Sequence, residues 1–133
     1  MTELTGRDPA SFEFQNIVYE KHGRRATVTF NRPEVLNCVN LATLLELQAA
    51  FQDVSWDDSI AVMVLTGAGE RAFCTGADLK ERKTMPMERV PHFVRNIRAL
   101  MDDVDAMPQP TVGVVNGFAF GGAQLEIGVA FEL

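Results

Sequence analysis

The spacing of apolar and polar positions predicts strands that alternate with helices. Residues 26–30 alternate between apolar and polar, as in a half-buried strand, and residues 16–20 form its predicted partner across a His22-Gly23 turn. Residues 60–65 and 111–115 are short apolar runs, which suit strands covered on both faces. Helices are predicted at 41–51, from near Asp78, at about 88–105 and after Gly121-Gly122. This order of elements predicts an α/β fold.

Several boundaries in this pattern have a local cause. Asn40 is a predicted N-cap for the first helix, and Trp56-Asp57-Asp58 is a predicted turn after it. We expect residues 1–13 to be a flexible polar leader and residues 14–133 to form a single domain. The segment 108–133 reads as a core strand and a core helix, since its charged residues are Glu126 and Glu132. We therefore expect a truncated domain, or one that needs a partner chain.

The composition excludes several classes of protein. With 47% apolar and 23% charged residues, the chain of 133 residues has the make-up of one globular domain. Its apolar runs reach about six residues, far short of the ~20 that span a bilayer, so no membrane span is predicted. A net charge of −6 gives the domain no nucleic-acid footprint. The two cysteines form no C-x-x-C pair, so no metal site is predicted. The first residues do not resemble a signal peptide, which predicts a reducing, cytoplasmic location.

Charge is distributed unevenly along the chain. Residues 71–98 hold seven Lys/Arg and three acidic residues, so this segment has a net charge of +4 and the rest of the chain has a net charge of −10. A basic segment in an acidic protein suits a phosphorylated small ligand, or equally a solvated helix face.

One pattern with possible chemistry occurs twice: an apolar strand, a glycine turn and the start of a helix. The first copy runs through 62–67 to the turn at 73–79, and the second through 111–117 to the turn at 118–123. The first N–H groups of a helix lack intrahelical partners, so two such turns at neighbouring strand ends can direct two N–H groups at one oxygen. Such turns are also common connectors. Nucleotide-binding glycine fingerprints and a G-x-S-x-G nucleophile turn are absent from the sequence.

Three segments together resemble the enoyl-CoA hydratase/isomerase (crotonase) family. They are Asn31-Arg32-Pro33-Glu34-Val35-Leu36-Asn37, then the stretch from Phe73 to Lys80, and finally Asn116 to Gly122. The resemblance runs from about Ile17 to Leu133 and corresponds to the N-terminal half of such an enzyme. It implies a ClpP/crotonase-like fold of repeated β-β-α units that assembles as a trimer or a hexamer. It also implies an acyl-CoA substrate, with coenzyme A as part of that substrate and no separate cofactor.

The resemblance also assigns roles to individual residues. The implied catalytic groups are the backbone N–H groups of Ala77 and Gly122, which form the oxyanion hole for a thioester enolate, and the carboxylate of Glu126. Counting forward from Gly117 places Leu125 at the carboxylate position, whereas counting back from the end of the chain places Glu126 there, which we prefer. The implied substrate-binding residues are Val35, Asn37, Thr75, Gly76, Ala77, Asp78, Leu79, Gly121, Gly122 and Ala123.

Two further residues near the first turn have simpler interpretations. Cys74 has no histidine or basic partner close in sequence, so we expect a packed residue rather than a nucleophile. Asp78 is expected to cap its helix rather than to catalyse.

The function predicted from the resemblance is acyl-CoA hydratase or isomerase chemistry. The alternatives are a non-catalytic crotonase-like subunit or binding protein, and a CoA-thioester hydrolase or dehalogenase of the same family.

Overall fold

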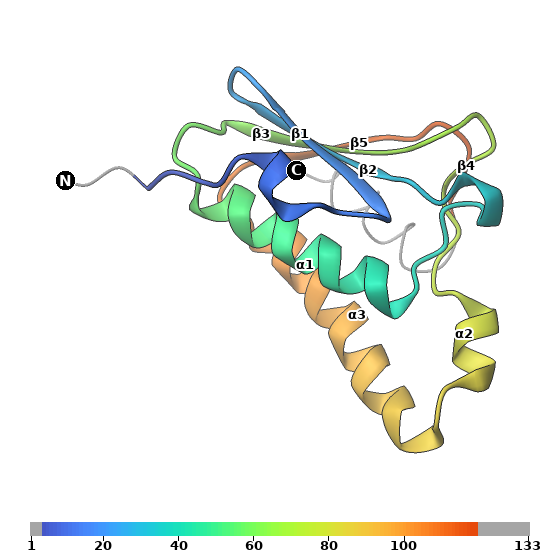
Figure 1. Cartoon of the computed structure of the whole chain (residues 1–133). Helices are drawn as coiled ribbons and strands as arrows, with labels where there is room; N and C mark the ends of the chain where they lie inside the picture. The colour runs from blue at the N-terminus through green and yellow to red at the C-terminus, as the bar shows by residue number, and fades with distance from the viewer. Residues whose placement is uncertain (1–3, 120–133) are drawn as a thin grey trace.

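A four-stranded sheet with helices packed along one face forms the body of the chain (Figure 1). The computed structural model describes residues 4–119. The strand order is β1-β2-β3-β5, in which β1 and β2 are antiparallel and β2, β3 and β5 are parallel. These strands are β1 (Ile17–His22), β2 (Arg25–Phe30), β3 (Val62–Gly67) and β5 (Thr111–Val114). A second, parallel pair is made by β4 (Ala72–Cys74) and β6 (Phe118–Ala119).

The helices follow the strands in the order that a repeated β-β-α unit requires. Helix α1 follows β1 and β2, and α2 and α3 follow β3 and β4. Figure 1 shows α1 and α3 side by side under the sheet, with α2 at its far end near β4. The α/β class and the β-β-α repeat are therefore confirmed. The helices are α1 (Leu41–Trp56), α2 (Leu79–Thr84) and α3 (Val90–Asp105), with short 3-10 turns η1 (Pro9–Phe12), η2 (Pro33–Val35) and η3 (Met87–Arg89).

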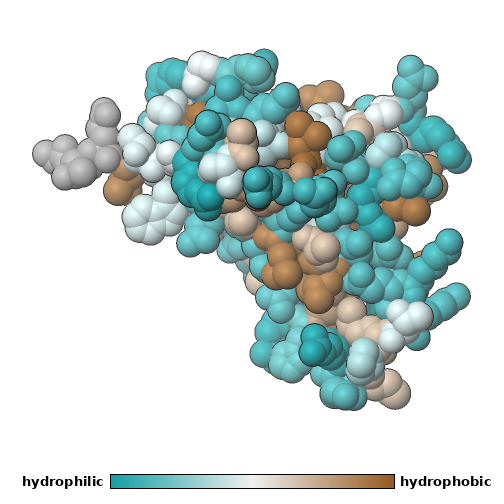
Figure 2. Space-filling model, viewed as in Figure 1, coloured by the Kyte–Doolittle hydropathy of each residue, from teal (hydrophilic) through white to brown (hydrophobic). Residues whose placement is uncertain are grey.

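Apolar residues at helical spacing form the core between the sheet and the helices. Burial recurs every three or four residues along α1 and α3, which turns one stripe of each helix toward the strands. The outer face of α1 leaves Leu41 and Leu45 exposed, and Figure 2 shows apolar side chains in the middle of this face, where α1 and α3 lie. The buried core includes Val28, Met63 and Leu65 of the sheet, Leu44, Leu47, Ala50 and Val54 of α1, and Phe93, Leu100 and Val104 of α3.

The predicted N-cap of α1 is confirmed, but the predicted end of the helix is wrong. The Asn40 side chain accepts hydrogen bonds from the Thr43 N–H at 2.8 Å and from the Thr43 hydroxyl at 2.6 Å. The helix continues through Trp56 rather than ending at 51, because Asp53 and Val54 are buried on its inner face. Asp57 then ends it by donating its N–H to the carbonyl of Val54.

Strand β5 also differs from its expected burial. Residues 111–115 were expected to be covered on both faces, yet Val112 and Val114 are 45% and 50% exposed among the described residues. Thr111, on the other face of the strand, is buried. The pattern of β5 is therefore that of a sheet strand with one covered face.

Residues 4–13 pack on the domain rather than forming a free leader. Leu4 and Asp58 exchange hydrogen bonds: the Leu4 N–H donates to the Asp58 carboxylate at 2.8 Å, and the Asp58 N–H donates to the Leu4 carbonyl. The Arg7 N–H donates to Asp53 at 2.7 Å, and its carbonyl accepts a hydrogen bond from the Lys21 ammonium at 2.8 Å. Charged residues of β1 and α1 thus hold this segment, a long-range effect that its own polar composition does not reveal.

Candidate active site

The carboxyl ends of the parallel strands meet at one edge of the sheet, and the sequence motifs follow directly from them. Phe30 of β2 pairs with Gly67 of β3, and Thr66 pairs with Val114 of β5. The loops that begin after these strands therefore start side by side. In open α/β sheets, this is the edge at which ligands bind.

A cavity of about 520 Å³ lies at this edge, between the loop that follows β2 and the segment that follows β4. One wall comes from the loop between β2 and α1, and the other from the segment that joins β4 to α2. Five of the predicted substrate-binding residues line it together: Val35, Thr75, Ala77, Asp78 and Leu79. The remaining lining residues, which were not among the predicted substrate-binding residues, are Glu34, Leu36, Cys38, Arg71 and Lys80.

Ala77 lies where the two walls join. The Val39 N–H donates to the Gly76 carbonyl at 2.7 Å, and the Asp78 N–H donates to the Val39 carbonyl at 2.8 Å, so Val39 and Ala77 form a parallel bridge. The groups on both sides of the Ala77 N–H are thereby fixed. Gly76 has φ +92°, a conformation that favours glycine and turns the chain at this point. Within residues 4–119 the half-buried Ala77 N–H has no hydrogen-bond acceptor.

Asp78 caps α2, as predicted, and also makes an ion pair with Arg32. One carboxylate oxygen accepts from the N–H groups of Lys80 and Glu81 at 3.0 and 3.2 Å. The other lies 3.3 Å from an Arg32 guanidinium nitrogen. Burial raises the pKa of Asp78, but the helix N–H groups and the guanidinium outweigh it and lower the pKa below its usual value. The carboxylate is therefore ionised at neutral pH.

The two cysteines have different surroundings. Cys74 is buried, in accord with the packed residue that was expected. Cys38 lines the cavity instead, and the sequence analysis did not single it out. Burial and the neighbouring Asp78 raise the pKa of the Cys38 thiol, although Arg32 acts in the opposite direction. Cys38 is therefore a protonated thiol at neutral pH rather than a nucleophile.

Asn37, expected to contact a ligand, has a buried side chain that bonds to backbone. Its carbonyl oxygen accepts from the Arg32 N–H at 2.8 Å, and its amide donates to the carbonyls of Ala68 and Ala72 at 3.0 and 2.9 Å. Its backbone has φ +56°, which asparagine tolerates better than most residues. In this position Asn37 joins the loop after β2 to the turn that connects β3 with β4.

Replacing Asn37 with Ala is expected to destabilise the fold by about 2 kcal/mol, because three buried or part-buried backbone groups each lose a hydrogen bond. Thermal or denaturant unfolding measures this loss. Asn31→Ala is the matched control, since Asn31 lies in the same loop with an exposed side chain. Equal stability of the two variants would contradict the assigned role.

The second glycine motif lies beside the first. The Asn116 side chain accepts from the Gly67 N–H at 3.1 Å and donates to the carbonyls of Gly69 and Ala72. A Cβ on Gly117 would lie 2.3 Å from the Arg71 carbonyl oxygen, so glycine is required for this close approach. The chain then continues as β6 alongside β4, the strand that leads toward Ala77. The predicted site residues that follow, Gly121, Gly122, Ala123 and Glu126, and its competitor Leu125, lie outside the described residues.

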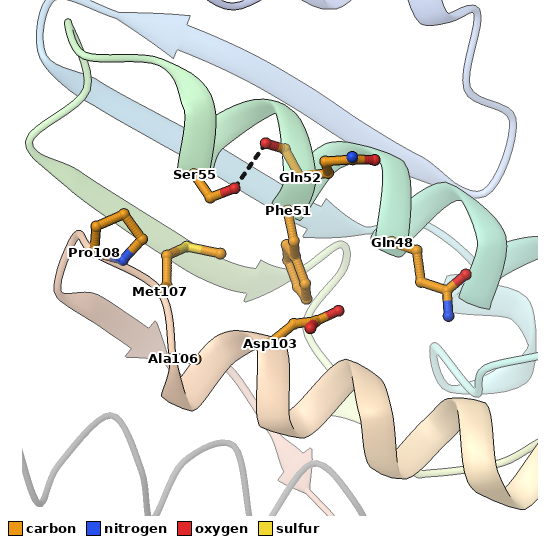
Figure 3. Close-up of a pocket in the computed structure, with 8 residues that line it drawn as sticks. All are labelled: Gln48, Phe51, Gln52, Ser55, Asp103, Ala106, Met107 and Pro108. Carbon is orange, nitrogen blue, oxygen red and sulfur yellow. Dashed lines mark hydrogen bonds between the residues drawn. The ribbon is translucent and has the colours of Figure 1, made fainter. Parts of the chain in front are cut away.

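A second cavity, of about 380 Å³, lies between α1 and the end of α3 and contains none of the predicted site residues. Figure 3 shows Phe51 pointing from α1 toward Asp103 of α3, and the Ser55 hydroxyl donating to the Gln52 carbonyl at 2.8 Å. The proton of the Ser55 hydroxyl is therefore used within α1. We assign no chemistry to this cavity.

All seven basic residues of 71–98 are exposed, and two of them, Arg71 and Lys80, also line the cavity between the two loops. His22 and His92 are exposed. Among residues 4–119 no His, Cys, Asp and Glu side chains cluster as metal ligands, and no helix in that range has the length and apolar content of a bilayer span.

Comparison with known proteins agrees with this arrangement of loops. The enoyl-CoA hydratase/isomerase family pattern matches residues 20–129. The chain belongs to this family. Among its relatives, it is 36% identical to the short-chain-enoyl-CoA hydratase of Clostridium acetobutylicum, over 83% of the chain and 42% of that protein. It is 32% identical to the crotonyl-CoA hydratase of Syntrophomonas wolfei, over 82% of the chain and 42% of that protein.

Solved structures of the enoyl-CoA hydratase/isomerase family share the fold. The crystal structure of an enoyl-CoA hydratase from Bacillus anthracis superposes with a TM-score of 0.82 and 40% identity, over 86% of this chain and 45% of that one. The chain thus spans less than half the length of the relatives it matches. The family predicted from the three motifs, and its correspondence to the N-terminal half, are confirmed.

Proposed function

We propose that this chain forms the thioester-binding part of an enoyl-CoA hydratase/isomerase active site. The observation that supports the proposal best is Ala77: its N–H faces no acceptor in the described part of the chain, while Gly76 and Asp78 on both sides are fixed to Val39. A fixed N–H without a partner beside a cavity is what an oxyanion hole requires. The acyl-CoA thioester oxygen accepts this hydrogen bond in our proposal.

The chemistry follows from the weak acidity of a thioester. Negative charge develops on the thioester oxygen when a proton or water is added to, or removed from, the neighbouring carbons, and a fixed donor stabilises that charge without reorganising. The second donor is assigned to the N–H of Gly122 or Ala123. Glu126 moves the proton as general acid and base. Arg71 and Lys80 supply positive charge at the cavity for the phosphates of coenzyme A.

The test uses the intact protein with crotonyl-CoA as a short enoyl-CoA. We expect hydration, followed as loss of the absorbance of the conjugated thioester, and thermal stabilisation by acyl-CoA of about 2.7 kcal/mol at a hundredfold excess over Kd. Stabilisation without turnover would indicate a non-catalytic binding subunit. Release of free CoA thiol or of halide from a suitable acyl-CoA would indicate a hydrolase or a dehalogenase. Neither stabilisation nor turnover would overturn the proposal.

Assembly and location follow from the same proposal. We assign a trimer or hexamer and a cytoplasmic location, on the basis of the family resemblance and of two cysteines that form no disulfide. Sedimentation of the intact protein tests the assembly.

A further inference from the structure

We propose that Arg32 is a positioning residue that sets the direction of the Ala77 N–H by joining the two walls of the cavity. This inference rests on the proposed function, in which that N–H stabilises the thioester oxygen. In this proposal Arg32 contributes to the site although it contacts neither the substrate nor the reacting atoms.

The guanidinium of Arg32 makes contacts on both walls. One nitrogen donates to the Cys38 carbonyl at 2.7 Å, on its own loop. The other nitrogen donates to Asp78 at 3.3 Å, on the opposite wall and next to Ala77. The side chains of Arg32 and Asp78 are only 15% and 14% exposed, so water does not substitute freely for these contacts. The ion pair thus links residues that are 46 positions apart in the sequence.

The backbone of Arg32 is fixed as well. Its N–H donates to the Asn37 side chain at 2.8 Å, and its carbonyl accepts from the Asn37 N–H at 2.9 Å. Asn37 is in turn bonded to the turn between β3 and β4. The guanidinium therefore extends from a fixed backbone at the edge of the sheet. Its contact with Asp78 fixes the position of that carboxylate relative to the sheet.

Asp78 connects this anchor to the donor. Its N–H and the Gly76 carbonyl both bond to Val39, and the Gly76 carbonyl belongs to the same planar peptide unit as the Ala77 N–H. Its two carboxylate oxygens divide between the cap of α2 and Arg32. Loss of the Arg32 contact leaves the cap in place but frees the carboxylate to rotate, which tilts the peptide units around Ala77. The planar fork of arginine suits two divergent acceptors better than the point charge of lysine.

The test compares Arg32→Met, Arg32→Lys and Asp78→Asn in the intact protein with crotonyl-CoA. Asparagine keeps one oxygen for the helix cap and replaces the oxygen that accepts from Arg32 with an amide NH2, so Asp78→Asn isolates the ion pair. We expect Arg32→Met and Asp78→Asn to lower kcat by about 10- to 100-fold, the loss that a small misplacement produces. We expect KM to change by less than about threefold, because the displaced N–H acts mainly in the transition state. Arg32→Lys is expected to recover part of kcat.

The double variant shows whether Arg32 acts through Asp78. If it does, Arg32→Met combined with Asp78→Asn loses no more activity than either change alone. Arg24→Met is the matched control, because Arg24 is exposed in the turn between β1 and β2, and it is expected to leave kcat unchanged. Fully additive losses, or a kcat for Arg32→Met equal to wild type, would overturn the proposal.

A second readout does not depend on turnover. In protein labelled with ¹⁵N at alanine, the Ala77 amide resonance is expected to shift in Arg32→Met and Asp78→Asn, and to stay in place in Arg24→Met. An unshifted resonance overturns the positioning role even if the wild-type protein has no hydratase activity. Conversely, an inactive wild type with a shifted Ala77 resonance contradicts the proposed function and leaves the positioning role supported.

Discussion

Ala77→Pro is expected to lower kcat/KM for an enoyl-CoA by about 10²- to 10³-fold in the intact protein, which is the loss typical of one oxyanion-hole donor. Proline removes the backbone N–H and nothing else that the described chain uses at this position, because that N–H donates to no residue within 4–119. The bonds that Val39 makes to Gly76 and Asp78 do not involve it. The measurement is steady-state hydration of crotonyl-CoA.

Two further variants separate the donor from the backbone. Proline restricts the residue before it, and Gly76 has φ +92°, so a loss of folding in Ala77→Pro is a competing result. Replacing the Ala77 peptide N–H with an ester oxygen removes the same donor without a ring and is expected to give the same loss. Ala77→Ser keeps the N–H and is expected to keep most of the activity. An ester variant with wild-type turnover would contradict the role of Ala77.

Lys21→Met is expected to reduce the free energy of unfolding by about 3 kcal/mol, the lower end of the range for breaking a buried ion pair. The ammonium lies 2.8 Å from both Asp53 and Asp57, whose side chains are 7% and 6% exposed. Without Lys21, two buried carboxylates face each other with no cation. The Arg7 carbonyl also loses its donor, which loosens the segment 4–13. Denaturant unfolding at pH 7 measures the change.

The same substitution is expected to raise the pH of acid unfolding. Burial raises the pKa of Asp57, but Lys21 and Ser59 outweigh it and lower the pKa below 3.8. A carboxyl with a lowered pKa in the folded state contributes stability above its unfolded pKa, and that stability is lost as the pH falls through the folded pKa. Without Lys21, burial dominates and the pKa of Asp57 rises. The acid transition therefore moves to higher pH.

Lys83→Met is the matched control for this cluster, because Lys83 is exposed on α2 and belongs to no ion pair among the described residues. It is expected to leave both stability and the acid transition unchanged. Adding Asp57→Asn to Lys21→Met removes one unpaired charge and is expected to restore part of the stability. A double variant that is less stable than Lys21→Met alone would show that repulsion between the carboxylates does not cause the loss of stability.

Local signals predicted most of the elements that position the site. The strands of the four-stranded sheet, the cap of α1 at Asn40 and the cap of α2 at Asp78 depend on nearest neighbours in the sequence, and each is confirmed. The family followed from three short motifs in the right order. The C-terminal part of the proposed oxyanion hole, with Gly122 and Glu126, stays a prediction.

Long-range contacts account for what the sequence analysis missed. Residues 4–13 read as a leader because their partners, Asp53 and Asp58, lie far along the chain. The position of Cys38 in the cavity was not predicted from the sequence, because the opposite wall, at Asp78, is formed by a distant segment. The structural role of Asn37 was not predicted, because a motif shows that a residue is constrained but not which neighbour constrains it; its contact with a ligand stays a prediction.

The sequence by itself determined the alternation of strands and helices, the glycine turns after β3 and β5 and the membership of the family, because these depend on spacing and on local backbone preference. Only the tertiary structure decided that the loop after β2 meets the loop after β4. Parallel pairing of β2, β3 and β5 puts their carboxyl ends at one edge, and this brings Arg32 to Asp78 and Val39 to Ala77. The direction of the Ala77 N–H, which has no acceptor within residues 4–119, follows from this contact, because it depends on hydrogen bonds between segments that are distant in the sequence.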